Sequence, residues 1–400
     1  MVRSSTPRVG SGVGASGDQT RRHNLSTLLT AVHQQGAQPR SRLTASSGLN
    51  RSTVSALVTE LEALGLLFET EPDPTNTVGR PSPTVQVSPG VVGIAVNPEV
   101  DAVTIGVVGL GGKVLKRIRY ETDHAPSVRE AVNISAAVIE GLRGELEANH
   151  TVVGVGIAVP GLVRSSDGLV RWAPHLEWTD EPVATMLAEA TGFPVAAGND
   201  ATLGAIAELT FGAGRGKTEL IYLNGGASGI GGGVIAAGRP LGGAGGYAGE
   251  FGHIRVDNTD ATYNDAESGT LESLVNRAAL VEALGLPSVD ADVLEAALLA
   301  SNDPHVKSLV HRQLEFLSTS LRNAVNVLNP QVIVLGGFLA TIFSAEPDFL
   351  RERVRAQSLG VSFEGVEITT AKLGSDLLMI GAAELAFAPL LADPAGVARS

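Results

Sequence analysis

The feature that most constrains the fold of this chain is a change of hydrophobic pattern near residue 89. Before it, apolar residues recur at helical spacing, as in Leu25, Leu28 and Leu29. After it, short apolar runs such as 91–96 and 103–108 alternate with longer helical segments. This alternation predicts an α/β body, and the different pattern ahead of it predicts a separate N-terminal domain. The length of 400 residues leaves room for two to four folded units.

The first 88 residues predict three helices followed by two strands. The third helix begins near Asn50, a residue type that caps helix N-termini well, and Gly48 precedes it. Short apolar runs at 66–68 and 85–87 predict a two-stranded ribbon. Two helices, a turn with glycine, a third helix and a ribbon follow the order of a winged helix-turn-helix domain. An ordinary small helical domain is the alternative.

The charge of the chain is divided unevenly along its length. The whole sequence carries a formal net charge of −13, but residues 1–55 contain seven arginines and one acid, a net charge of +6. A basic head on an acidic body indicates a local contact with nucleic acid, and a chance cluster in a solvated tail is the alternative. The residues expected on phosphates are Arg21, Arg22 and Arg80. The residues expected at or near base edges are Asn50, Arg51, Ser52, Thr53 and Ser55.

Composition excludes several kinds of site and protein. Cysteine is absent, so the chain has no disulfide, no thiolate nucleophile and no zinc site with Cys ligands. An uncharged run that resembles a membrane span, 220–238, contains seven glycines and too few large apolar side chains. Residues 1–20 are rich in Gly and Ser and lack the apolar core of a secretory signal. We therefore expect a disordered tail on a soluble cytoplasmic protein without a membrane partner.

Four short motifs in the α/β body carry a family resemblance. They are Gly156-Ile-Ala-Val-Pro160-Gly161, Gly198-Asn199-Asp200-Ala201, Glu250-Phe-Gly252-His253 and Asn329-Pro-Gln-Val-Ile-Val-Leu-Gly336-Gly337. Each is weak alone, but their order and spacing resemble the ROK family of repressors, open reading frames and sugar kinases. The head, with Asn50-Arg-Ser-Thr-Val-Ser55 and Gly79-Arg80-Pro81, is similar to the DNA-binding half of the family's repressor branch.

The resemblance implies an α/β fold with an N-terminal winged helix-turn-helix and a two-lobed, actin-like (ribonuclease-H-like) ROK domain. The implied divisions are a tail at 1–20, the winged helix-turn-helix at 21–88, a first lobe at 89–198 plus about 375–395, and a second lobe at 199–374. A sugar would lie in the cleft between the lobes, held by Asn199, Asp200, Glu250, His253 and Glu272, with His175 where the family commonly has Asn. Carboxylates and amides are suited to the vicinal hydroxyls of sugars. Asp200 matches the general base of the kinases.

Two departures from the family pattern concern phosphate binding. The first hairpin reads Asn97-Pro98-Glu99, where the kinases carry an Asp-x-Gly-Gly-Thr-like phosphate loop. Pro lacks an N–H donor and a carboxylate repels a triphosphate, so we expect no kinase activity. The glycine-rich run 225–233 resembles the second phosphate loop. With the first loop lost, we favour the alternative that these glycines let two strands pass closely.

A third departure removes the family's zinc knuckle. The pattern Cys-x-Cys-Gly-x-x-Gly-Cys-x-Glu is replaced by 263–272, in which the cysteines are gone and Glu272 remains. We therefore expect no metal and no other cofactor, with His253 available to the sugar. A carboxylate–His metal site using His253 and Asp265 is the alternative. Trp178, close to His175 in sequence, is either a stacking wall of the sugar site or a packing residue.

Together these patterns predict a sugar-responsive transcriptional regulator of carbohydrate metabolism genes, a repressor by default. Its expected partners are double-stranded operator DNA and a small carbohydrate or sugar phosphate. Palindromic operators favour a homodimer or a dimer of dimers. The alternatives are an ATP-dependent sugar kinase and a constitutive DNA-binding protein with a vestigial sugar cleft.

Overall fold

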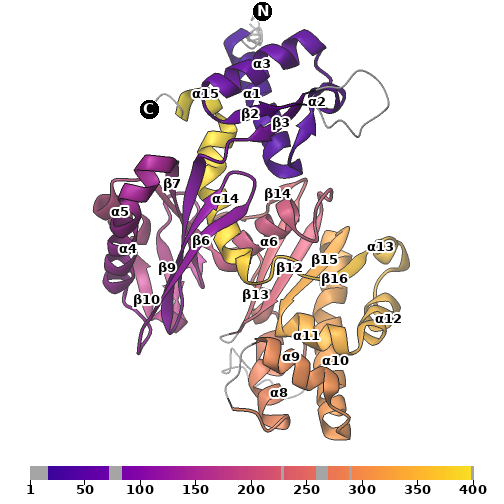
Figure 1. Cartoon of the computed structure of the whole chain (residues 1–400). Coiled ribbons are helices and arrows are strands. Elements are labelled where there is room, and N and C mark those ends of the chain that lie inside the picture. Colours follow the sequence, from indigo (N-terminus) through magenta and orange to yellow (C-terminus); the bar gives the residue numbers. More distant parts are fainter. Residues whose placement is uncertain (1–16, 72–82, 227–228, 258–268, 288–290, 398–400) are drawn as a thin grey trace, which may run out of the picture. The chain divides into compact units, whose positions relative to one another are not determined.

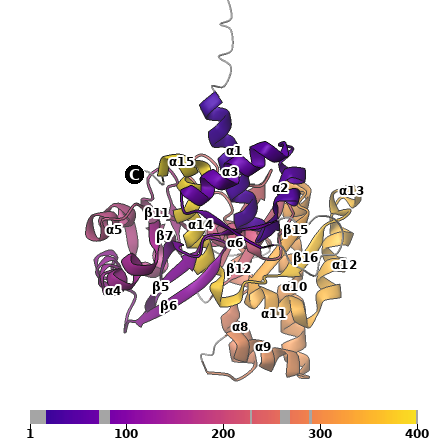
Figure 2. The ribbon, with the colours of Figure 1, turned by 45° about the horizontal axis from the view of Figure 1, so that its top comes forward.

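Pro89 begins the larger of two units into which the chain folds. The head unit is Met1–Ser88 together with Ala388–Ser400, and the body unit is Pro89–Phe387. The structure, a computed structural model, describes residues 17–71, 83–226, 229–257, 269–287 and 291–397 (Figures 1 and 2). The chain therefore leaves the head unit at Ser88 and returns to it at Ala388.

The head unit packs three helices over a small sheet. Leu25, Leu28 and Leu29 of the first helix are fully buried. Asn50 caps the third helix, as its sequence predicts, because its Oδ1 accepts a hydrogen bond from Thr53 N at 2.9 Å. The sheet has the order β1-β3-β2, one strand more than the predicted ribbon. The elements are α1 (Gly17–Gln35), β1 (Gln38–Pro39), α2 (Arg40–Ser47), α3 (Arg51–Ala63), β2 (Leu67–Thr70), β3 (Thr84–Val87) and α15 (Pro394–Val397).

Helix α1 begins earlier than the hydrophobic pattern predicts. It includes residues 17–20, which belong to the tail expected to be disordered. Asp18 in its first turn lies 3.1 Å from Arg22 Nε and 3.7 Å from Arg21 Nη1. An acid at a helix N-terminus and ion pairs three or four residues apart both favour the helix. Apolar periodicity misses this start because residues 17–24 contain no apolar side chain.

The body unit contains two five-stranded sheets with the same topology (Figure 1). In each, three strands consecutive in the chain pair antiparallel, and two later strands add in parallel beside the first. The first sheet has the order β11-β7-β4-β5-β6 and the second has the order β14-β13-β12-β15-β16. This repeat is the actin-like pair of α/β lobes that the family resemblance implies.

Helices cover the first sheet on both faces. Helices α4 and α5 lie side by side on one face (Figures 1 and 2). Strands β4 and β5 are buried along their whole length, as expected for a sheet covered on both sides. The first-lobe elements are β4 (Val91–Pro98), β5 (Ala102–Gly109), β6 (Lys113–Glu121), α4 (Val128–Asn149), β7 (Thr151–Val159), β8 (Leu162–Val163), β9 (Val170–Ala173), η1 (Pro174–Leu176), β10 (Trp178–Glu181), α5 (Val183–Thr191) and β11 (Val195–Asn199).

The second sheet shares one hydrophobic core with the helices that pack against it, including α9, α10, α11 and α12. The elements are α6 (Asp200–Phe211), β12 (Leu220–Gly225), β13 (Ile230–Ala236), β14 (Arg239–Pro240), η2 (Phe251–His253), α7 (Leu271–Leu274), α8 (Arg277–Ala283), α9 (Ala291–Ala300), α10 (Pro304–Leu328), β15 (Val332–Gly337), α11 (Phe338–Ala345), α12 (Pro347–Gln357), α13 (Gly360–Phe363), β16 (Glu367–Thr370), η3 (Gly374–Asp376) and α14 (Leu377–Ala392).

Helix α14 packs closely on strand β7. A Cβ atom on Gly156 would lie 1.8 Å from Ala382 O, so only glycine fits at this contact. The helical stretch 374–392 is long and apolar enough to cross a membrane, unlike the run 220–238, and half of it is buried inside the protein. A buried core helix meets the same criteria, and the packing of α14 places it in that class.

Candidate functional site

One cavity in the body unit is lined by all six residues expected at the sugar. Its volume is about 170 Å³. It collects side chains from the junction of β11 and α6, from the β12–β13 hairpin and from η2. The six residues are His175, Asn199, Asp200, Glu250, His253 and Glu272. Tertiary structure therefore brings together residues that are up to 97 positions apart in the sequence.

Asn199 and Asp200 lie where β11 ends and α6 begins. Asn199 caps α6, because its Oδ1 accepts a hydrogen bond from Thr202 N at 2.9 Å. Its Nδ2 donates to Gly161 O at 3.0 Å and to Asp200 Oδ1 at 3.2 Å. Both N–H groups of the Asn199 amide thus have protein partners. The residue orients Asp200 and leaves that carboxylate as the main polar group of the pair facing the cavity.

The carboxyl group of Asp200 is shielded from bulk water by the surrounding protein. This burial raises the pKa of Asp200 to about 6. The neighbouring Glu250 carboxylate adds to the rise, and the N–H of Ala201, which donates to Oδ1 at 2.8 Å, opposes it. Near neutral pH the group is mainly an acceptor, and below pH 6 it also becomes a donor.

Glu250, His253 and Glu272 form the second polar group of the cavity. His253 Nδ1 lies 3.4 Å from Glu272 Oε1, and Glu272 Oε2 accepts a hydrogen bond from Ile230 N at 3.3 Å. Burial raises the pKa of Glu250, the Glu272 charge adds to this, and His253 opposes it. The cavity therefore combines carboxylate acceptors with an imidazole that donates or accepts, a set suited to the hydroxyl groups of a sugar.

Glycines of the run 225–233 allow close packing around these acids. A Cβ atom on Gly229 would lie 2.6 Å from Glu272 Oε2, and the φ of Gly229 is +150°. A Cβ atom on Gly233 would lie 2.6 Å from Ala201 O, in the first turn of α6. These two glycines thus allow Glu272 and helix α6 to pack closely around the site.

The sequence analysis misses two residues of the cavity, Trp172 and Asn224. Burial decides between the two roles proposed for Trp178. Trp172 on β9 and Asn224 on β12 both line the cavity, and Trp172 is 46% exposed. Trp178 is 2% exposed, and its Nε1 donates to Pro126 O at 3.0 Å, so it is a packing residue. The only sequence signal for Trp172 is its position three residues before His175.

The hairpin at 97–99, which the family resemblance aligns with the first phosphate loop of the kinases, is closed by its own contacts. Asn97 is buried at the end of β4, and Glu99 N donates to Ala102 O at 2.7 Å. The Glu99 carboxylate accepts a hydrogen bond from Thr104 Oγ1 at 2.6 Å and lies 3.7 Å from Arg119 Nη2. Among the described residues that line the cavity, none comes from this hairpin.

Helix α3 presents exposed polar residues at its N-terminus. Arg51 and Ser52 are exposed, and Thr53 is partly exposed. Ser52 Oγ donates to Asn50 Oδ1 at 2.7 Å, so Asn50 and Ser52 support the cap. Ser55 Oγ accepts a hydrogen bond from Arg40 Nη1 at 2.9 Å, an interaction that the sequence did not suggest. Within the described part of the head, Arg51 has no ion-pair or hydrogen-bond partner and is available to a ligand.

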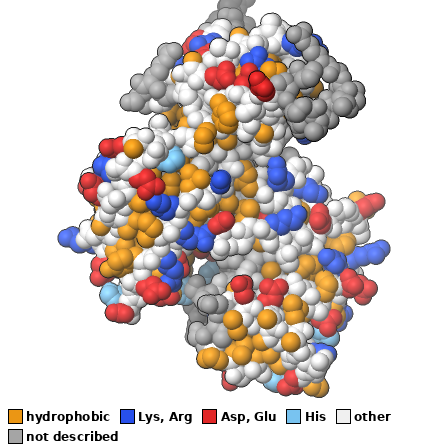
Figure 3. Space-filling model, viewed as in Figure 1, with side chains coloured by type: hydrophobic (Ala, Val, Ile, Leu, Met, Phe, Trp, Pro, Cys, Tyr) orange, Lys and Arg blue, Asp and Glu red, His pale blue; other side chains and the backbone are white. Residues whose placement is uncertain are grey.

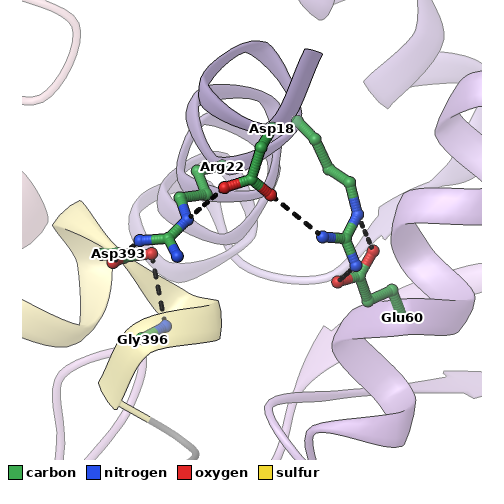
Figure 4. A network of polar contacts seen from close by, with 6 residues as sticks. Asp18, Arg22, Glu60, Asp393 and Gly396 are labelled. Carbon is green, nitrogen blue, oxygen red and sulfur yellow. Dashed lines mark hydrogen bonds and ion pairs between the residues drawn. The ribbon is translucent and has the colours of Figure 1, made fainter. Parts of the chain in front are cut away.

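The arginines expected on phosphates pair with carboxylates of the head unit (Figure 4). Arg21 Nε lies 3.0 Å from Glu60 Oε2, and its Nη2 contacts the other oxygen. Arg22 Nη1 lies 2.9 Å from Asp393 Oδ2. Acidic and basic side chains accordingly lie side by side on the surface of the head unit (Figure 3). The third arginine, Arg80, lies outside the described residues.

A metal site has little support in the part of the chain that the structure describes. There, no three His, Asp or Glu side chains are grouped so that they could hold a metal ion. Asp265, the alternative partner of His253, lies outside the described residues. The absence of a metal cofactor stays a prediction.

Comparisons with known proteins identify the family to which this chain belongs. The ROK family model matches residues 94–388. A glucokinase of Halalkalibacterium halodurans is 30% identical over 266 residues, 62% of this chain and 80% of that protein. The xylose repressor of Bacillus subtilis is 25% identical over 368 residues, 91% of this chain and 95% of that protein.

The solved structures that resemble this chain also include both a regulator and a kinase. A ROK family transcriptional regulator, described as a homolog of the E. coli MLC protein, superposes with a TM-score of 0.78 at 23% identity over 95% of this chain and 100% of its own. A ROK hexokinase from Thermus thermophilus superposes with a TM-score of 0.60 at 28% identity over 77% of this chain and 100% of its own. The match of the family model covers most of the sequence, and this chain belongs to the ROK family.

Proposed function

We propose that this protein is a sugar-responsive, DNA-binding transcriptional regulator, most simply a repressor, of carbohydrate genes. The observation that carries the proposal is the presence, in one chain, of a body-unit cavity lined by carboxylates, amides and imidazoles and of a helical head with an exposed Arg51. The xylose repressor relatives match over both parts, whereas the glucokinase relative matches 62% of the chain. The carbohydrate would change the affinity of the head for its operator.

The head supports DNA binding through the arrangement of its elements. Helix α2, the left-handed Gly48, and helix α3 have the order of a helix-turn-helix, and strands β2 and β3 would form the wing. Helix α3 would then enter the major groove with Arg51 at a base edge. One short recognition helix makes few contacts, so we propose a symmetric dimer, or a dimer of dimers, that reads a palindromic operator in the cytoplasm.

We propose that helix α14, which contains the boundary between the two units, couples the cavity to the head. Asp200 is the first residue of α6, and a Cβ atom on Gly381 of α14 would lie 2.5 Å from Leu203 O of α6. The two helices therefore touch backbone to backbone inside the body unit. Helix α14 continues to the head unit, where Asp393 directly after it pairs with Arg22. A shift of α6 on sugar binding would be passed along this helix.

A sugar kinase is the second candidate, and the match of Asp200 to the kinase base favours it. Against it stands Glu99, whose carboxylate is held by Thr104 where a phosphate loop would be needed. Incubation with ATP, magnesium, glucose and xylose should give no sugar phosphate. Turnover that disappears in Asp200→Asn would establish the kinase instead, and turnover that persists in that variant would come from a contaminant.

The regulator is tested by measuring operator affinity with and without sugar. An operator is first selected from a random duplex library with the purified full chain. Fluorescence anisotropy then gives its Kd alone and with xylose or glucose, the sugars that the names of the relatives suggest. We expect a change of about 5–150-fold, the usual range of allosteric coupling. Glu250→Ala should abolish this change and leave the affinity without sugar nearly intact, and Glu147→Ala, an exposed acid on α4, is the matched control.

Each result of this experiment decides one part of the proposal. Linkage requires operator DNA to change sugar affinity by the same factor as sugar changes operator affinity. A sugar that binds in the cavity without changing operator affinity would disprove the coupling. Operator binding with no response to any sugar would favour the constitutive regulator with a vestigial cleft.

A further inference from the structure

We propose that the effector contains at least two sugar rings, with the second ring in a second cavity that adjoins the first. This inference rests on the proposed sugar function of the first cavity and specifies its ligand as a disaccharide or other glycoside. The second cavity has a volume of about 490 Å³. It belongs wholly to the body unit.

The two cavities adjoin each other. Trp172, His175, His253 and Glu272 line both of them, so the wall of the first cavity becomes the wall of the second. The first cavity, at about 170 Å³, has the size for a single sugar ring. Sites for larger ligands usually measure about 300–1,000 Å³. The combined space therefore exceeds what one monosaccharide fills.

The shared wall has the chemistry of a carbohydrate platform. Trp172 is 46% exposed, and Pro174 and His175 beside it are also exposed, so an open aromatic ring borders both cavities. Ligand pockets are typically lined by apolar and aromatic side chains together with a few polar groups that fix the ligand. An indole combines a broad apolar face with little conformational freedom, which suits it to the flat C–H face of a sugar ring.

The far side of the second cavity offers an ordered polar rim over an apolar base. Ser273 is exposed, and its Oγ donates to Thr270 O at 2.9 Å, which leaves the oxygen free to accept from a hydroxyl. Asn276 is held in place because its Oδ1 accepts a hydrogen bond from Ala279 N at 3.0 Å. Val275 and Phe338, both buried, also line the cavity. A second ring would find hydroxyl partners and an apolar surface together.

A nucleotide fits this second cavity less well than a sugar. The cavity extends toward residues 270–278, and none of its described lining residues comes from the hairpin at 97–99 that takes the place of the phosphate loop. The Glu272 carboxylate lies in the wall and would repel a phosphate chain, whereas Arg277 in the same wall would attract one, so ADP is included among the probes below. These observations favour an uncharged second ring.

Calorimetry with matched sugars tests the proposal on the full chain. The probes are glucose and xylose, the disaccharides cellobiose, maltose and xylobiose, and ADP with magnesium. We expect the best disaccharide to bind at least about tenfold more tightly than its own monosaccharide, because the second ring adds contacts at little extra cost in rigid-body entropy. Quenching or a blue shift of Trp172 fluorescence should accompany binding, since Trp178 is buried and unaffected.

A variant that fills only the second cavity separates the two sites. Ala278 is exposed, lines the second cavity and does not line the first, so Ala278→Trp should remove the advantage of the disaccharide and leave the monosaccharide Kd nearly unchanged. Ala296→Trp, at an exposed position of α9 that lines neither cavity, is the matched control and should behave as wild type.

The outcomes distinguish this inference from the proposed function. If glucose or xylose binds and no disaccharide binds more tightly than its monosaccharide, the two-ring inference is wrong and the regulator stands. If ADP binds and Ala278→Trp abolishes that binding, the second cavity is a nucleotide site and the inference is also wrong. If no probe binds, both the inference and the sugar function fail.

Discussion

Arg22 in the first helix of the head unit and Asp393 near the end of the chain form an ion pair, with Nη1 2.9 Å from Oδ2 (Figure 4). Asp393 Oδ1 also accepts a hydrogen bond from Gly396 N at 3.3 Å, which holds the short helix α15. The C-terminus is thereby tied to α1, the helix that carries two of the arginines expected on phosphates. The pair is partly exposed, so its contribution to stability is small and its effect on charge matters more.

Removing the charge of Asp393 should strengthen DNA binding. Asp393→Asn keeps an acceptor for Gly396 and removes one of the two carboxylates that pair with Arg22. Only Asp18 then remains, which leaves more of the positive charge of Arg22 for a phosphate. We expect higher operator affinity, a salt slope steeper by about one, and a loss of stability of no more than about 1 kcal/mol. Anisotropy titrations over a series of salt concentrations measure this. Asp348→Asn, which disrupts an exposed ion pair in the body unit, is the control. An unchanged slope would show that Arg22 stays away from the phosphates.

Replacing Arg51 should weaken operator binding more than replacing Arg21. Arg51 is exposed and without a partner in the described head, whereas Glu60 already engages Arg21. Arg51→Ala should cost about 1–3 kcal/mol if its guanidinium reads a base, with relaxed preference at one position per half-site. Arg21→Ala should have a smaller effect that is similar for all sequences. Equal losses for both variants on operator and random DNA would contradict a role for Arg51 in base recognition.

The stability of the protein should depend on pH through Asp200. Its folded pKa of about 6 lies above the ordinary value of 3.8, so the folded state binds more protons between these values and stability falls as pH rises from about 4 to 6. Asp200→Asn removes this effect and should stabilise the protein at pH 7 by on the order of 1–3 kcal/mol. Below pH 4 the two proteins should differ little. Melting curves over this pH range test it, and a variant that is less stable than wild type at pH 7 would contradict the pKa.

Gly156 should be the least replaceable position in the contact between β7 and α14. In Gly156→Ala the new Cβ would lie 1.8 Å from a backbone oxygen, Ala382 O, which has no flexible side chain to move aside. We expect a loss of at least about 3 kcal/mol, or no folded protein. Gly144→Ala in α4 is the control: it has open space around its Cβ position and should gain about 0.5–1 kcal/mol. Chemical denaturation of both variants gives the comparison.

The purified protein should contain no stoichiometric zinc. The chain has no cysteine, and His253 lies 3.4 Å from Glu272 without a third ligand among the described residues. A chelator should leave the melting temperature unchanged. One tightly bound zinc ion per chain in elemental analysis would point instead to His253 with carboxylates from the stretch that includes Asp265.

Much of the secondary structure can be predicted from local sequence. The spacing of Leu25, Leu28 and Leu29 and the cap at Asn50 place helices α1 and α3, because both signals act within one or two turns of chain. The start of α1 at Gly17 escaped prediction because it depends on the charges around Asp18 rather than on apolar spacing. The polar residues of the cavity could be named because their short motifs resemble those of the ROK family, and local periodicity alone would not have identified them.

Tertiary structure alone decided which of these residues face a ligand and which serve the fold. Asn199 belongs to the expected sugar set, yet its amide is occupied by Gly161, Asp200 and Thr202, a set of partners drawn from two segments. Of the two tryptophans, Trp178 is buried and Trp172 lines the cavity, a choice that depends on how β9 and β10 pack. Sequence patterns report local periodicity and residue type, whereas burial and pairing depend on segments hundreds of residues apart, as Arg22 and Asp393 are.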